Sequence, residues 1–177
     1  NWPPQVRRMP AQRIFALDLP GHGKSGGLGS QSIADYARAV VDFLDAAHLN
    51  AAVFIGHSMG SAIALTLALD FPKRVLGLGL VGSGARLRVA PQILEQTASE
   101  SLFPLAIKLI NDAEFGPSVN PRLKELAARQ MAAIRPSVIH GDFLACNEFD
   151  VMPCLGKISS PTLILCGAED NLTPVKY

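Results

Sequence analysis

The feature that most constrains this chain is a serine held between two glycines at the junction of two apolar segments. Gly56-His57-Ser58-Met59-Gly60 fits the pattern G-x-S-x-G. The apolar run 51–55 comes directly before it, and the mostly apolar run 61–69 follows. A short apolar run that ends at glycine, followed by a longer one, predicts a strand, a sharp turn and a helix. Small residues two positions either side of Ser58 let strand and helix pass closely.

A second segment, Gly23-Lys24-Ser25-Gly26-Gly27, fits the same pattern but has loop residues on both sides. Ser58, and not Ser25, is therefore predicted to lie on the strand-to-helix turn. Residues 21–26 also fit the dinucleotide pattern G-x-G-x-x-G, which has to open directly into a helix. Residues 27–29 continue the loop instead, and a phosphate-binding loop would need glycine where Asp18 stands. These departures argue against nucleotide binding.

The order of elements predicts an α/β fold with a mostly parallel sheet, helices on both faces and a helical insertion. The expected strands are nearly all apolar, as sheets covered on both sides require. Glycine, proline and apolar periodicity place strands at 13–17, 51–55, 75–81 and 161–166, and helices at about 32–48 and 59–69.

The first expected helix has the clearest signals for its start and its buried face. Ser30 or Ser32 can cap its N-terminus. Its apolar stripe at helical spacing consists of Ile33, Tyr36, Ala37, Val40, Val41 and Leu44. Residues 86–149 are also helical in pattern, and prolines divide them into segments.

Composition narrows the class of protein further. Of 177 residues, 49% are hydrophobic and 18% are charged, which indicates a core-rich globular chain. Lys and Arg number 16 against 15 Asp and Glu, so no basic surface for nucleic acid is expected. Residues 51–69 lack charged side chains, yet their polar cluster lies in the middle, which favours a buried strand and helix over a membrane span.

The cysteines and the other metal-binding residue types do not have the spacing of a metal or redox site. Three cysteines without a C-x-x-C pair indicate reduced thiols and a cytoplasmic protein. No ligand cluster for a metal is visible, and no cofactor is expected. The oligomeric state is left open by the sequence.

An acidic turn follows the last expected strand. In residues 167–174, Asp170 is preferred over Glu169 as an acid that orients a catalytic histidine. Asp and Asn also favour solvated turns without any catalytic role. The serine upstream favours the catalytic interpretation, since serine then precedes the acid in the chain.

Residues 18–25, 56–60 and 161–174 together resemble the α/β-hydrolase superfamily over nearly the whole chain. The resemblance implies Ser58 as nucleophile, Asp170 as triad acid and the Met59 N–H as an oxyanion donor. Serine at position 58 disfavours the relatives with an Asp nucleophile, the haloalkane dehalogenases and epoxide hydrolases. The resemblance also implies a core of residues 1–85 and 150–177 and a helical cap of residues 86–149. It further implies elbow glycines at Gly56 and Gly60 and pocket candidates at His57 and Ser83.

The sequence departs from the family in one respect that bears on activity. The family order is Ser, Asp, His, but no histidine follows Asp170 in this chain. The base and the second oxyanion donor are therefore expected outside it, and both ends look cut. The side chain of His57 is expected to leave the turn in a direction that does not reach Ser58. His140 is an outside candidate for the base.

The expected function is that of a serine hydrolase, which cleaves a carboxylic ester or related acyl bond of a small molecule through an acyl-enzyme on Ser58. Hydrolysis of carbon–carbon bonds, lactones or thioesters and perhydrolysis remain alternatives on the same fold. A non-catalytic binding protein is the alternative outside enzymes.

Overall fold

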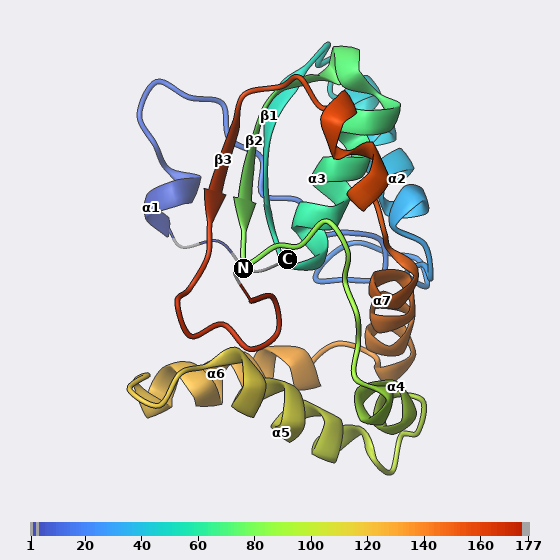
Figure 1. Ribbon diagram of the computed structural model, residues 1–177, viewed down its shortest axis with the longest axis vertical. Coiled ribbons are helices and arrows are strands. Elements are labelled where there is room, and N and C mark those ends of the chain that lie inside the picture. Colours follow the sequence, from blue (N-terminus) through green and yellow to red (C-terminus); the bar gives the residue numbers. More distant parts are fainter. Residues whose placement is uncertain (1, 3, 175–177) are drawn as a thin grey trace.

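The three strands found among the described residues form one parallel sheet in the order β1-β2-β3. A computed structural model describes residue 2 and residues 4–174 of the chain (Figure 1). The strands are β1 (Ala52–His57), β2 (Val75–Val81) and β3 (Thr162–Leu165). This arrangement confirms the predicted α/β class and the parallel sheet.

The carboxyl ends of the three strands lie at one edge and are held in register. His57 lies opposite Val81, and Val81 lies opposite Leu165. Just beyond them, the Ser58 N–H donates to the Val81 carbonyl at 3.0 Å. The Gly82 N–H donates to the Leu165 carbonyl at 2.8 Å. The segments that follow the strands therefore start side by side, where ligands bind in open α/β sheets.

One face of this sheet is covered by α3 (Met59–Asp70), and α2 (Ile33–Ala46) packs against α3. Ser32 caps α2 by accepting a hydrogen bond from the Asp35 N–H at 3.4 Å, and the six residues of its predicted stripe are all buried. Helix α3 is buried over most of its length, because it packs on β1 and β2 on one side and on α2 on the other. A 3₁₀ turn (Pro72–Arg74) then leads into β2.

The side chains on the other face of the sheet are largely exposed. Val53 and Ile55 are 60% and 52% exposed, and Leu163 is 63% exposed. The short helix α1 (Pro4–Arg7) lies beyond β3, away from α2 and α3 (Figure 1). Among the described residues, coverage of the sheet is therefore concentrated on one face.

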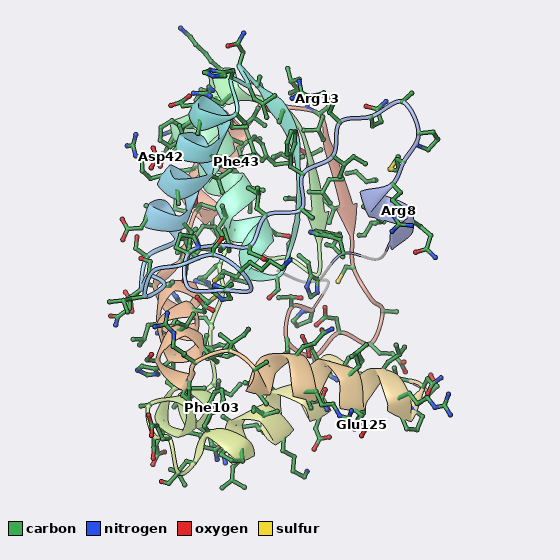
Figure 2. All side chains as sticks on the ribbon, turned by 180° about the vertical axis from the view of Figure 1, so that it is seen from behind. Arg8, Arg13, Asp42, Phe43, Phe103 and Glu125 are labelled. Atoms are coloured by element: carbon green, nitrogen blue, oxygen red, sulfur yellow. The ribbon has the colours of Figure 1, made fainter. Side chains whose placement is uncertain are left out.

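The strand predicted at 13–17 is wrong. These residues have no strand assignment and are exposed or half-exposed. The Phe15 ring packs on Phe43 of α2 with ring centroids 5.4 Å apart (Phe43 is labelled in Figure 2). A strand needs a partner for its N–H and C=O groups, and none of the described strands pairs with this segment.

Four helices fill the chain between β2 and β3, and the described residues there contain no strand. They are α4 (Pro91–Thr97), α5 (Phe103–Glu114), α6 (Pro121–Ala132) and α7 (Pro136–Glu148). Each has proline at its first or second position, so these prolines begin helices as well as separate them. The helices surround a second apolar cluster of Ile93, Phe103, Ala106, Ile110 and Ile139.

The two segments that join these helices to the sheet run beside each other. The Leu87 N–H donates to the Phe149 carbonyl at 3.2 Å, and the Val151 N–H donates to the Ala85 carbonyl at 2.8 Å. The 3₁₀ helix η2 (Met152–Lys157) then leads to β3. The β-strand arrows point toward α5 and α6, which lie beyond the carboxyl edge (Figure 1). We call residues 86–149 the cap; their role as a lid stays a prediction.

Among the residues that the structure describes, no helix combines the length and apolarity needed to cross a membrane.

Candidate active site

Ser58 has an unusual backbone conformation. Its φ of 53° and ψ of −119° place it in a region that non-glycine residues rarely adopt, between the end of β1 and the start of α3. Such strain costs on the order of 1–3 kcal/mol and persists only where the surroundings enforce it. Here the Ser58 N–H is bonded to Val81, and its carbonyl accepts from the Ser61 N–H at 2.8 Å.

The two glycines of the turn have different surroundings. A Cβ atom on Gly56 would overlap the backbone carbonyl of Gly60, so glycine is required there for strand and helix to pass. The buried Ser61 hydroxyl strengthens this junction by donating to the Gly56 carbonyl at 2.7 Å. A Cβ on Gly60 would meet no described atom within 4 Å. The predicted crowding is therefore present at Gly56 and absent at Gly60 in the described part of the chain.

The N-terminus of α3 begins directly after Ser58. Met59 is the first residue of this helix, and the first N–H groups of a helix have no partner within it. Together with the helix dipole they favour negative charge at this end. An oxyanion formed at Ser58 would lie where such charge is stabilised, although the role of the Met59 N–H stays a prediction.

Asp170 lies in the turn after β3, and three donors fix its carboxylate. The N–H groups of Leu172 and Thr173 donate to Oδ1 at 2.9 and 2.7 Å. The Thr173 hydroxyl donates to Oδ2 at 2.8 Å. Partial burial raises the pKa of Asp170, but these hydrogen bonds and the nearby His57 outweigh it and hold the pKa below its usual value.

His57 and Asp170 approach each other around Gly82. A Cβ atom on Gly82 would lie 3.4 Å from both His57 Nε2 and Asp170 Oδ2, and the φ of 49° also favours glycine. Surrounding protein lowers the pKa of His57 even though the residue keeps an exposed surface, and the charge of Asp170 opposes this. Ser83 follows Gly82 directly, at the carboxyl end of β2.

Ser25 and His140 are engaged elsewhere. The Ser25 hydroxyl donates to the Asp18 carbonyl at 2.7 Å within the glycine loop. The His140 ring is hydrogen-bonded through Nδ1 to the Thr97 hydroxyl at 3.0 Å, inside the cap. The Ser25 hydroxyl is therefore used within its own loop, and the His140 ring is held inside the cap through Nδ1.

The cap reaches the loop that carries Asp170. Burial raises the pKa of Glu114 at the end of α5, and the negative charge of Asp170 raises it further. A Cβ on Gly116 would lie 2.9 Å from Glu169 Oε2, so the turn after α5 contacts the same loop. Figure 1 shows this loop lying against α5 and α6.

A cavity of about 260 Å³ lies between residues 86–88 and residues 171–174. It is lined by Arg86 and Arg88, whose guanidinium groups lie 3.7 and 3.6 Å from Asp150. Sequence reasoning had missed these arginines and Glu114. The contact between Thr173 and Asp170 could have been predicted from the sequence, because an aspartate side chain in a turn commonly accepts hydrogen bonds from residues two or three positions further on.

No group of three or more His, Cys, Asp or Glu residues in the described part of the chain is arranged to hold a metal ion.

Comparison with known proteins identifies the family. A family model described as "alpha/beta hydrolase fold" matches residues 2–177. A putative carbamate hydrolase RutD from Azorhizobium caulinodans is 38% identical over 98% of this chain and 69% of its own length. A 3-oxoadipate enol-lactonase from Acinetobacter baylyi is 27% identical over 98% of this chain and 68% of its own length. The chain therefore belongs to the α/β-hydrolase family.

A solved structure agrees with this assignment. A thermophilic esterase superposes with a TM-score of 0.78 at 37% identity, covering 90% of this chain and 62% of the esterase. The chain thus spans about two thirds of the length of these three relatives.

Proposed function

We propose that the full-length protein is a serine hydrolase that cleaves a small carboxylic ester through an acyl-enzyme on Ser58. The observation that carries the proposal is the strained backbone of Ser58 at the strand-to-helix turn, beside the loop of Asp170. Membership of the α/β-hydrolase family and the 37% identity to an esterase support it.

The reaction divides into two steps. In the first, the Ser58 Oγ attacks the ester carbonyl while a histidine base takes the hydroxyl proton, and the Met59 N–H stabilises the oxyanion. Collapse of this intermediate expels the alcohol, which receives that proton from the histidine. In the second, a water activated by the same base attacks the acyl-enzyme and releases the acid and the free Ser58. Asp170 orients the histidine and stabilises its charged form.

The base is assigned to a histidine outside residues 1–177. The family order of Ser, Asp, His supports this assignment. His22 and His140 are hydrogen-bonded to other partners, and His48 is exposed at the end of α2. His57 lies near Asp170 and is therefore the competing candidate for the base within this chain, which the variant below tests.

A lactone, which is a cyclic ester, is the second candidate substrate. The enol-lactonase that matches 98% of this chain favours it. Lactone opening uses the same nucleophile and oxyanion stabilisation, with the leaving alcohol still attached to the acyl group.

The test combines covalent labelling with substrate comparison on the full-length protein. A fluorophosphonate probe followed by peptide mapping should label Ser58, and the Ser25→Ala variant should be labelled equally. His57→Gln should keep hydrolysis of p-nitrophenyl butyrate within about tenfold, since the base lies elsewhere. Comparing p-nitrophenyl esters with simple γ-lactones separates the two substrate classes. Label on Ser25, or absence of label on an intact Ser58, would refute the proposal.

A further inference from the structure

The glycine loop, α2 and the last cap helix meet at a buried polar cluster that the proposed reaction does not use. Asp142 of α7 is 9% exposed, and Tyr36 of α2 is fully buried. The Tyr36 hydroxyl donates to Asp142 Oδ1 at 2.6 Å. His22 Nε2 from the glycine loop lies 2.8 Å from Asp142 Oδ2. Three segments that are distant in sequence are therefore joined through one carboxylate.

The hydrogen-bond partners of His22 favour its protonated form. Its Nδ1 lies 3.1 Å from the Pro20 carbonyl, which can only accept, so Nδ1 carries a proton. Its Nε2 faces a carboxylate oxygen, which accepts when it is ionised. With Asp142 ionised, both ring nitrogens are placed to donate, so this geometry favours the imidazolium form of His22. The hydrogen bond to Asp142 raises the pKa of His22, and this effect outweighs the opposing effect of burial.

Glycine residues beside the cluster allow the backbones of the loop and α7 to approach closely. A Cβ on Gly29 would lie 3.1 Å from both the Tyr36 hydroxyl and a methyl group of Val138 on α7. A Cβ on Gly141 of α7 would lie 3.0 Å from the Ser30 carbonyl. Glycine on each side thus brings the loop and α7 together. This packing gives the glycine-rich segment, which resembles nucleotide motifs, a structural role.

Further hydrogen bonds support the same contact. Arg135, at the start of α7, donates to the Gly27 carbonyl. The Ser30 N–H donates to the Tyr36 hydroxyl at 2.9 Å, so this hydroxyl accepts one bond while it donates another. The loop is therefore tied to both α2 and α7.

The other charged and titratable groups near His22 do not replace it as the responsive group. Asp18, on the same loop, adds a negative charge that favours the imidazolium. Burial raises the pKa of the Tyr36 hydroxyl, so it stays a donor at neutral pH. Burial and the charge of Asp142 raise the pKa of the Cys146 thiol to about 12, so it stays neutral. Among these groups, His22 is the one whose ordinary pKa lies near neutrality.

We propose that protonated His22 fastens the cap helix α7 to the core through Asp142, and that loss of this proton loosens the helix. The direction of the pH effect follows from linkage. A folded-state pKa above the ordinary 6.5 means that the stabilisation is complete below pH 6.5. It is lost as pH rises through the raised pKa. Attachment of α7 should therefore weaken as the pH rises above 6.5 and through the raised pKa of His22.

Two measurements on the full-length protein test this without any substrate, so their outcome is independent of the proposed hydrolase activity. The first is an NMR titration of His22, whose midpoint should lie above 6.5. The second is amide hydrogen exchange of residues 136–148 across the same pH range, corrected for the intrinsic pH dependence of exchange. Protection of α7 should fall over the pH range in which His22 titrates.

Three variants sharpen the result. His22→Gln keeps a donor toward Asp142 but cannot titrate, so its α7 protection should no longer show the pH step. His48→Asn removes an exposed histidine that lies outside the cluster, and the pH step should remain. Asp142→Asn should lower the His22 midpoint; if this variant does not fold, His22→Gln decides. A His22 midpoint at or below 6.5, or an unchanged pH step in His22→Gln, would overturn the proposal.

Discussion

Two segments of this chain share the pattern G-x-S-x-G and have opposite structures. At Ser58 the pattern lies between β1 and α3, and the serine backbone is strained with a φ of 53°. At Ser25 the pattern lies within a loop, and the hydroxyl is bonded to the Asp18 carbonyl at 2.7 Å. Ser58 therefore lies at the carboxyl edge of the sheet, whereas the Ser25 side chain is hydrogen-bonded within its own loop.

The difference shows that the elements around the pattern, and not the pattern, decide its chemistry. The strand and helix around Ser58 hold an unfavourable backbone conformation in place, which leaves the side chain at the carboxyl edge of the sheet. The loop around Ser25 uses its polar groups on itself and its glycines to pack against the cap. The following predictions test this contrast, beginning with the largest expected effect.

Ser58→Ala in the full-length protein should lower kcat for a p-nitrophenyl ester by on the order of 10⁴–10⁶, because members of a triad act as a unit. Ser25→Ala, the matched control, should stay within about threefold, since surface hydrogen bonds of this kind contribute about 1 kcal/mol or less. Steady-state kinetics of the two variants decide the point. Equal losses in both variants would mean that the two serines are not distinguished by their surroundings.

Asp170→Asn should lower kcat by on the order of 10⁴, because an amide cannot stabilise a charged histidine in the same way. The fold should remain intact by circular dichroism, as an amide oxygen can still accept from Leu172 and Thr173. Asp18→Asn is the control, since Asp18 Oδ2 accepts from the Lys24 N–H at 3.0 Å within the glycine loop. Its kcat should be close to that of the wild type. A larger loss in Asp18→Asn than in Asp170→Asn would contradict the assignment.

Gly56→Ala should destabilise the full-length protein by about 3 kcal/mol, because the added methyl overlaps the Gly60 carbonyl in a tightly packed junction. Gly60→Ala should change stability by about 1 kcal/mol or less, since its Cβ meets nothing among the described residues and alanine favours helix. Urea denaturation at equilibrium measures both changes. A comparable loss in Gly60→Ala would reveal packing around Gly60 from residues beyond those described.

Gly23→Ala should cost about 1–2 kcal/mol, because its φ of 52° strains alanine and the methyl overlaps the Asp18 carboxyl group. That carboxyl can rotate away, so the loss should be smaller than at Gly56. Gly26→Ala, with open space and no positive φ, should stay within about 0.5 kcal/mol. Thermal unfolding of the pair provides the comparison, and equal melting temperatures would show that the loop adapts freely.

Local periodicity determined much of this fold. The six-residue stripe of α2 was readable because helical spacing brings those residues to one face, and all six are buried. The strand at 75–81 and the turn at Ser58 were readable because apolar runs, glycines and chain order are short-range signals. Proline spacing likewise indicated that the cap is divided into several helices, whereas the position of the prolines at the helix starts came from the structure.

Contacts between distant segments were decided only by the tertiary structure. Residues 13–17 are apolar enough for a strand, but pairing depends on a neighbour that a local pattern does not contain. His22 and Asp142 are 120 residues apart, and their pairing follows from how the cap folds back onto the glycine loop. The approach of His57 and Asp170 around Gly82 depends on the register of three strands. Side-chain periodicity reports which face of an element is buried, whereas the partner on that face is chosen by the packing of the whole chain.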